Sequence, residues 1–185
     1  HWKKCVEILP SHYSSWTNLG VVYNRIYKEH DKAILCFEEA LKFKPGYGIA
    51  LFGLGQAYEA KKDVEQAMNY YTQCIQQNPN VVNPRSKLAN LYFANGEFNR
   101  AIQLNEEIMN IDPEEALPYV NFGNYYMLMG DTLKGISFFE QGVQKGAPAQ
   151  VSIFLMKYYD SKGDVNKREY YKSLVRQQTG SIGSK

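Results

Sequence analysis

Side chains that could carry out acid–base or nucleophilic chemistry are few in this sequence of 185 residues, and they lie far apart. The three histidines are His1, His12 and His30, and neither internal one has a serine, a cysteine and an acid beside it in a known nucleophile arrangement. Adjacent carboxylates such as Glu38 and Glu39 point in different directions on a helix, so they indicate solvated faces. We therefore predict no catalytic residues and expect that the chain is not an enzyme.

The cysteines do not have the spacing of a metal site. Cys5, Cys36 and Cys74 form no Cys-x2-Cys pair and no cluster with histidine. They lie on predicted packing faces, where a free cysteine behaves as a small hydrophobe. A phosphate-binding loop is also missing, because Gly53-Leu54-Gly55 falls inside a predicted helix. We expect no metal and no cofactor.

The most regular feature of the sequence is the spacing of its prolines and tyrosines. Successive prolines are separated by 35, 34, 34 and 35 residues in the series Pro10, Pro45, Pro79, Pro113 and Pro148. A tyrosine series keeps nearly the same period, at Tyr23, Tyr58, Tyr92, Tyr126 and Tyr159. Such a period indicates one supersecondary unit copied in tandem.

Each unit contains two apolar runs with the three- and four-residue steps of a helix face, for example Trp16, Leu19 and Tyr23, followed by Ala33 and Phe37. First helices are predicted over residues 13–26, 48–61, 82–95, 115–129 and 149–161. Second helices are predicted over residues 30–43, 64–77, 98–110, 132–145 and 165–178. No alternating strand pattern occurs, so the predicted fold is all-α.

Small and polar residues recur at fixed places in the unit. Gly20, Gly55, Ala89 and Gly123 are expected where the two helices of a pair approach closely. Glycines such as Gly96 and Gly130 fit the turn between the helices, because glycine adopts the left-handed backbone conformation found there most easily. The aspartates Asp63, Asp131 and Asp164 are predicted N-caps of second helices.

The run Trp16-x2-Leu19-Gly20-x2-Tyr23, followed by Ala33-x3-Phe37 and Pro45, resembles the tetratricopeptide repeat. Three further copies keep the register, with Leu54-Gly55, Leu88-Ala89 and Phe122-Gly123 at the equivalent positions. The resemblance covers nearly the whole chain. It implies a right-handed α-solenoid of about five stacked helix-turn-helix pairs, in which each pair contacts mainly its neighbours.

The expected array spans residues 1–178, and residues 179–185 are expected to be a flexible tail. Residues 1–12 are interpreted as the end of a truncated repeat, and the repeats themselves are 13–47, 48–81, 82–115, 116–148 and 149–178. The last repeat is degenerate, and Lys162 and Lys167 fit a solvated basic cap.

Because no first helix precedes residues 1–12, we interpret the chain as a piece of a longer protein. The apolar residues near Trp2 are then expected to favour self-association through the N-terminal end.

The first repeat holds one residue more than the next copies. Ten residues separate Tyr23 from Ala33, whereas nine separate Tyr58 from Ala67. The sequence predicts that residues 25–31 absorb the extra residue as a longer turn.

Composition narrows the class of partner and the compartment. The net charge is only +2 and 44% of residues are hydrophobic, which favours a folded domain and does not favour nucleic-acid binding. No run of about twenty apolar residues is present, so we expect no direct membrane insertion of this segment. Unpaired cysteines favour a cytoplasmic compartment. Tethering to a membrane through a region before residue 1 is the alternative.

In tetratricopeptide arrays the first helices line a concave groove that holds extended or helical peptides. Carrying this register over implies a groove whose polar members offer donors and acceptors to a peptide backbone, and whose apolar members form pockets. The predicted peptide-binding residues are Asn18, Arg25, Phe52, Gln56, Lys87, Asn90, Phe93, Asn121, Asn124 and Met127.

Two family subtypes fit poorly. The clamp for a C-terminal carboxylate is incomplete, because Ser86 stands where its first lysine would be. The asparagine ladder of sugar-transferase arrays is interrupted by Gly53 and Lys87. The predicted function is a protein–protein interaction scaffold that binds a peptide or protein segment and does no chemistry of its own. The alternative is a regulatory or docking tail of a larger membrane-bound protein or glycosyltransferase-like enzyme.

Overall fold

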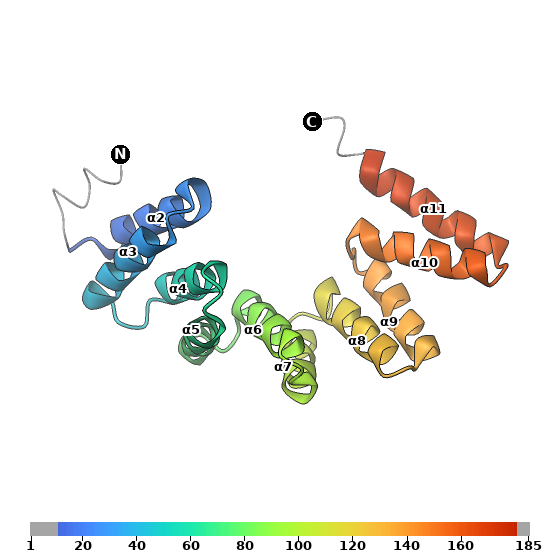
Figure 1. Ribbon diagram of the computed structural model, residues 1–185, viewed down its shortest axis with the longest axis horizontal. Coiled ribbons are helices and arrows are strands. Elements are labelled where there is room, and N and C mark those ends of the chain that lie inside the picture. Colours follow the sequence, from blue (N-terminus) through green and yellow to red (C-terminus); the bar gives the residue numbers. More distant parts are fainter. Residues whose placement is uncertain (1–10, 181–185) are drawn as a thin grey trace. The chain divides into compact units, whose positions relative to one another are not determined.

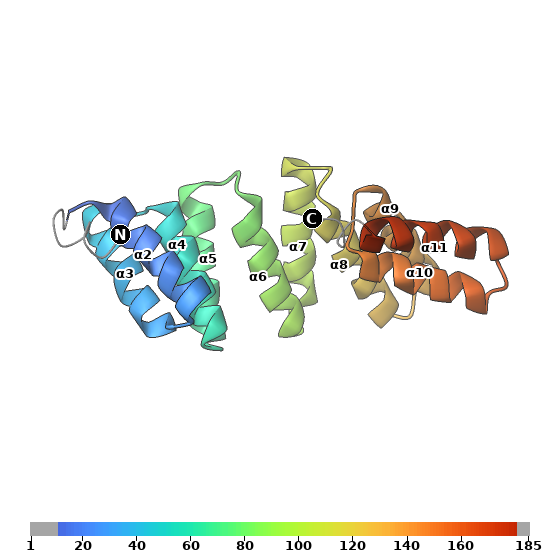
Figure 2. The ribbon, with the colours of Figure 1, turned by 90° about the horizontal axis from the view of Figure 1, so that it is seen from above.

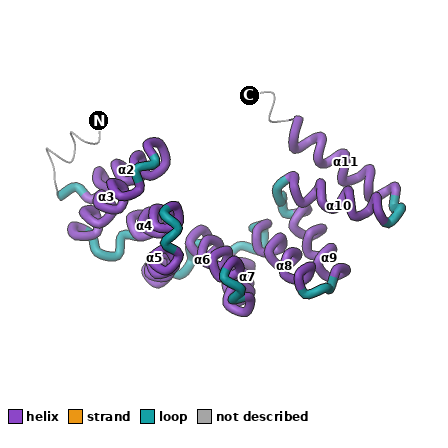
Figure 3. The backbone as a smooth tube through the Cα atoms, viewed as in Figure 1, coloured by secondary structure: helices purple, strands orange, loops and turns teal. Residues whose placement is uncertain are grey.

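The computed structural model describes residues 11–180, in which every regular element is a helix (Figure 1). The helices follow one another in pairs joined by short loops, and no strand occurs in this part of the chain (Figure 3). The predicted all-α fold is confirmed.

Helix boundaries agree with the predicted ranges to within two residues at each end. The first helices of the pairs are α2 (Tyr13–Val22), which continues as the π-helix η1 (Tyr23–Tyr27), α4 (Gly48–Ala60), α6 (Val82–Ala94), α8 (Ala116–Leu128) and α10 (Ala149–Ser161). The second helices are α3 (His30–Phe43), α5 (Val64–Gln77), α7 (Phe98–Ile111), α9 (Thr132–Gln144) and α11 (Val165–Gly180). Because α11 continues through Gly180, Thr179 and Gly180 are helical where a flexible tail was expected.

Some predictions concern residues outside the described range. The truncated half repeat, its self-association surface near Trp2, and Cys5 all lie within residues 1–10. The rest of the predicted tail lies within residues 181–185.

The chain divides into two compact units, residues 1–104 and 105–185, and the boundary falls inside α7. Within the first unit α3 packs against both α2 and α4, and α5 packs against α4 and α6. Within the second unit α9 packs against α8 and α10, and α10 packs against α11. These helices therefore contact their neighbours in sequence, as expected for a tandem repeat.

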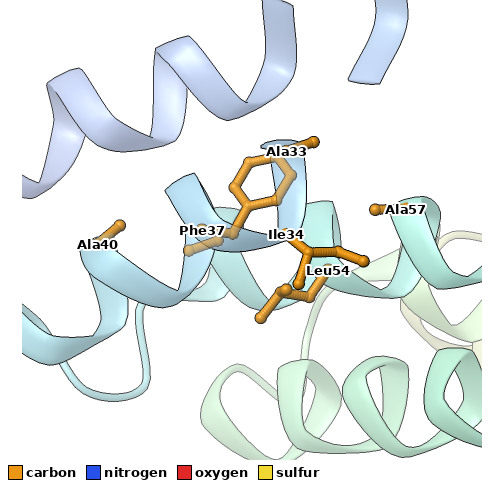
Figure 4. Packing of buried hydrophobic residues seen from close by; sticks show 7 residues of the cluster. Ala33, Ile34, Phe37, Ala40, Leu54 and Ala57 are labelled. Atoms are coloured by element: carbon orange, nitrogen blue, oxygen red, sulfur yellow. The ribbon is translucent and has the colours of Figure 1, made fainter. Parts of the chain in front are cut away.

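Phe37 of α3 belongs to a core cluster of the first unit, and its side chain is 1% exposed. A Cβ atom on Gly20 of α2 would lie 2.7 Å from the Phe37 ring, and one on Gly53 of α4 would lie 2.5 Å from it. The ring therefore fills the space that the two glycines leave open. Ile34 and Leu54 belong to the same cluster, together with alanines of α3 and α4 (Figure 4).

The predicted caps and turns are confirmed. Asp63, Asp131 and Asp164 each accept a hydrogen bond through Oδ1 from the backbone N–H three residues later, at 3.2, 3.1 and 3.0 Å. Gly96 and Gly130 have φ angles of +78° and +80°, the left-handed region in which glycine lacks the strain of other residues. These local signals explain why the helix ends could be read from the sequence.

The longer turn predicted at residues 25–31 is wrong, because the extra residue is taken up by the π-helix η1. In every other pair, the N–H of the residue before the second helix donates to the carbonyl of a tyrosine five residues earlier, as Asp63 does to Tyr58 at 3.0 Å. In the first pair Glu29 donates to the Tyr23 carbonyl at 3.0 Å across six residues. The hydrogen bond to the tyrosine carbonyl is therefore kept in the first pair, and the π-helix accommodates the one additional residue that this bond encloses.

Glu140 of α9 joins three helices of the second unit, in which α10 and α11 lie side by side (Figure 2). Its Oε1 accepts hydrogen bonds from Tyr159 Oη at 2.8 Å, Lys167 Nζ at 2.9 Å and Tyr171 Oη at 3.2 Å. Burial alone would raise the pKa of Glu140, but the bonds from Lys167 and Tyr159 outweigh it and lower the pKa. Lys167 therefore contributes to packing rather than only to a solvated cap.

Candidate functional site

One repeat position among the predicted groove residues faces the preceding repeat. This position comes immediately before the large apolar residue that repeats in the first helices, such as Leu54 of Leu54-Gly55. Its occupants are Gly53, Lys87, Asn121 and Phe154. Gly53 receives the Phe37 ring, and Phe154 contacts the Phe139 ring edge-on at 5.1 Å between centroids. Lys87 Nζ donates to Glu59 Oε1 at 3.1 Å, and Asn121 Nδ2 donates to Asn105 Oδ1 at 3.0 Å. These residues therefore form the seam between successive repeats.

A pocket of about 320 Å³ opens on the first helices of the first unit. Three of the predicted groove residues, Arg25, Gln56 and Lys87, lie in its wall. Together with five further residues they bring side chains of η1, the start of α3, α4 and α6 to one place. The complete lining is Asn24, Arg25, Lys28, His30, Gln56, Glu59, Ala60 and Lys87.

A chain of polar contacts holds Glu59 in the wall of this pocket. Tyr71 Oη donates to Glu59 Oε2 at 2.6 Å, while Lys87 Nζ donates to the other carboxylate oxygen. The Tyr71 side chain is fully buried, and burial, together with the bond to Glu59 and its charge, raises the pKa of the phenol far above its usual range. Tyr71 therefore keeps its proton and remains a donor, which fixes the carboxylate.

Another part of the pocket wall is held by a bond between Asn24 and His30. His30 Nδ1 lies 2.6 Å from Asn24 Oδ1, and Asn24 is buried in η1. Because the amide oxygen can only accept, the proton of this bond belongs to His30 Nδ1. The bond connects η1 to the first turn of α3 across the widened turn.

The apolar residues predicted for the groove make contacts within the protein. Phe52 packs against the Tyr71 ring at 5.7 Å between centroids, and Phe93 meets Phe98 edge-on at 5.2 Å. Met127 is half-buried and packs against the core cluster of the second unit. All three side chains are partly buried and keep part of their surface accessible.

The predicted asparagines differ in exposure. Asn18, Asn90 and Asn124 are exposed on α2, α6 and α8. Asn121 is half-buried, and its partner Asn105 is only 3% exposed. Asn105 takes the place of the ring that three of the other second helices carry, at Phe37, Tyr71 and Phe139. The third repeat therefore replaces an aromatic contact with a hydrogen bond between amides.

This arrangement gives a prediction for Asn121. Replacing it by alanine removes the donor to the buried Asn105 oxygen, and we expect the free energy of unfolding to fall by about 1 kcal/mol. Asn124→Ala, on the same helix but exposed, should change stability by less than about 0.5 kcal/mol. Urea denaturation of both variants measures the difference. Equal stabilities would contradict a structural role for Asn121.

Five pocket residues, Asn24, Lys28, His30, Glu59 and Ala60, were not among the predicted peptide-binding residues. Lys28 and His30 lie in the segment that holds the extra residue of the first repeat. Whether their side chains reach the pocket therefore depends on the conformation of that segment. The one-residue excess between Tyr23 and Ala33 was the available signal, because it marks the only irregular turn among the first four copies.

The two described cysteines do not line this pocket. Cys36 and Cys74 are free and buried, and burial, with a smaller effect from the Glu39 charge, raises the pKa of Cys36 to about 11. A thiol with that pKa stays protonated at neutral pH. No group of three or more His, Cys, Asp or Glu side chains that could hold a metal ion occurs within residues 11–180. In the same range, every helix is too short or too polar to cross a membrane.

The described helices follow one another in pairs, and the same position of each pair contacts the preceding pair. This arrangement defines a helical repeat protein. Comparison with known families agrees, since models described as tetratricopeptide repeat match residues 13–47 and 59–119. The chain belongs to the tetratricopeptide repeat family.

Curated relatives share parts of the array. The chain is 25% identical over 133 residues to anaphase-promoting complex subunit 3 of Schizosaccharomyces pombe, which covers 72% of this chain and 19% of that protein. It is 45% identical over 69 residues to the tetratricopeptide repeat domain-containing protein PYG7, chloroplastic, of Arabidopsis thaliana, covering 36% of this chain and 23% of the relative. The chain thus spans about a fifth of the length of these relatives.

Solved structures share the fold. PilF of Pseudomonas aeruginosa superposes with a TM-score of 0.76 at 15% identity, over 90% of this chain and 76% of PilF. YrrB, described as a tetratricopeptide repeat protein with an unusual peptide-binding site, superposes with a TM-score of 0.68 at 18% identity, over 84% of this chain and 80% of YrrB. The helical repeat fold is therefore shown, and proteins of this family generally serve as noncatalytic scaffolds.

Proposed function

We propose that this chain is a noncatalytic interaction module that binds a peptide segment of a partner protein on the first-helix face of its repeats. The observation that carries the proposal is the pocket of the first unit, which side chains of η1, α4 and α6 build together with the start of α3. Repeat solenoids use surfaces of this kind for binding. The peptide-binding site described for the structurally similar YrrB supports the same class of ligand.

The side chains on this face suit a peptide backbone. Gln56 is half-buried in the pocket wall and Asn90 is exposed on α6, so each presents an amide that can donate and accept. Phe52 and Phe93 are only partly buried, and their accessible surface could receive an apolar side chain of the ligand. On the second unit, Asn124 provides an exposed amide on α8.

The test begins with selection of binding peptides from a random library displayed on phage, followed by affinity measurements by fluorescence anisotropy. We expect Gln56→Ala and Asn90→Ala to weaken binding of the selected peptides by about fivefold or more each, as for contacts at a hot spot. Thermal unfolding should show little change in stability, because neither side chain belongs to the buried core.

Lys162→Ala provides the control, since Lys162 is an exposed residue between α10 and α11. It should leave the affinity unchanged. Weaker binding by Lys162→Ala, with normal binding by Gln56→Ala and Asn90→Ala, would move the site to the last helix pair. Failure of any peptide to bind would reject the proposal for short linear ligands.

A further inference from the structure

The charges around the pocket are unbalanced. Its wall contains three cations, Arg25, Lys28 and Lys87, and a single carboxylate, Glu59. Glu59 is already engaged, because Lys87 and Tyr71 bond to its two oxygens. Arg25 and Lys28 are both exposed and have no ion-pair partner among residues 11–180. Two positive charges in the pocket wall therefore have no ion-pair partner among the described residues.

These two cations belong to the irregular turn of the first repeat. At the position of Arg25 the next three repeats carry Ala60, Ala94 and Leu128. Lys28 ends η1 in the left-handed conformation, with φ +57° and ψ 24°. The widened turn and the bond between Asn24 and His30 hold this segment against the pocket. No other described repeat combines such a turn with two unpaired cations.

We infer that the pocket accepts a side-chain carboxylate, from Asp or Glu, of the bound peptide, with Arg25 and Lys28 as the contacting cations. Charge complementarity is the reason, because a carboxylate placed there gains two charge-assisted hydrogen bonds while Glu59 remains paired with Lys87. Gln56 and the Asn24–His30 pair complete a polar wall around the acid. The inference rests on the proposed peptide binding and gives that ligand its chemical class.

The chain offers a matched pair of variants. Lys28 and Lys62 both have left-handed backbones, with φ +57° and +63°, in turns where other repeats have glycine. Replacing either lysine by glycine removes one positive charge and suits the backbone, so both variants should fold. Only Lys28 lies in the pocket wall. Lys28→Gly therefore tests the pocket, and Lys62→Gly controls for the loss of charge and for the turn.

The experiment selects peptides from a displayed library in which one central position is Glu, Asp, Gln or Asn and the flanking positions vary. Wild-type protein should enrich Glu or Asp over the corresponding amide, and added salt should reduce the preference. Arg25→Gln and Lys28→Gly should each weaken binding of an enriched acidic peptide by about two- to fivefold. Lys62→Gly should bind that peptide as wild type does.

Synthetic peptides distinguish the source of the carboxylate. An acidic peptide with an amidated C-terminus should bind, and its Gln counterpart with a free C-terminus should not. The reverse would overturn the assignment to a side chain, and equal weakening by Lys62→Gly would overturn the assignment to the pocket. Enrichment of peptides without any acidic preference would reject this inference but leave the proposed peptide binding intact. If no peptide is enriched, both are rejected.

Discussion

Replacement of Phe37 by alanine is expected to lower the free energy of unfolding by about 3–5 kcal/mol. The ring is 1% exposed and fills the gap between Gly20 of α2 and Gly53 of α4, so its loss leaves a cavity between two repeats. Neither glycine can fill that space. Because neighbouring pairs stabilise one another in a solenoid, the loss should affect more than one helix pair.

Chemical denaturation measures this effect, and hydrogen exchange locates it. Leu35→Ala is the matched control on the same helix, because Leu35 is 62% exposed and should contribute less than about 0.5 kcal/mol. Amides of α2, α3 and α4 should all lose protection in Phe37→Ala. Loss of protection confined to α3 would contradict the role of Phe37 as a contact between repeats.

The second large effect is expected at Gly55. A Cβ atom there would lie 2.4 Å from Tyr71 Cε1, which is far inside van der Waals contact. The Tyr71 ring is fully buried and its hydroxyl is bonded to Glu59, so the ring cannot move away without breaking that bond. We expect Gly55→Ala to lower the free energy of unfolding by about 1–3 kcal/mol, and Gly55→Leu to lower it further.

Gly48 provides the comparison within the same helix. The nearest atom to a Cβ added there is Cys74 Sγ at 3.9 Å, an ordinary contact distance. Gly48→Ala should therefore be neutral or slightly stabilising, since alanine favours a helix more than glycine does. Melting temperatures of the two alanine variants make the test. Similar values would show that α4 and α5 do not pack as closely at Gly55 as the structure indicates.

The helices could be predicted because their signals are local. The N-caps Asp63, Asp131 and Asp164 and the turn glycines mark helix ends, and the three- and four-residue steps mark the buried faces. The small residues of α2, α4 and α8 could also be interpreted correctly, because a position that repeats as glycine or alanine indicates close approach. None of these inferences needs information about a distant part of the chain.

The site was harder to predict because it depends on contacts between repeats. The repeat register alone places Arg25, Gln56 and Lys87 on the first-helix face, and in the structure all three line one pocket. The pairing of Asn121 with Asn105 does not follow from it, because either amide alone is compatible with a solvated surface. The conformation of the irregular turn was also missed. A longer loop and a π-helix fit the same residue count, and the Asn24–His30 bond that accompanies the π-helix cannot be seen in the sequence.

The π-helix also bears on how a tandem array can change during evolution. An insertion usually shifts every later residue relative to its partners, yet here the shift ends at Glu29, where the closing bond to Tyr23 is restored. From Glu29 onward the spacing to Ala33 and Phe37 equals that from Asp63 to Ala67 and Tyr71. A single extra residue thus changes the surface of one repeat while the buried positions of that repeat keep their spacing. A turn between paired helices can therefore take up an extra residue without disturbing the packing that follows, a property that designers of repeat arrays could use.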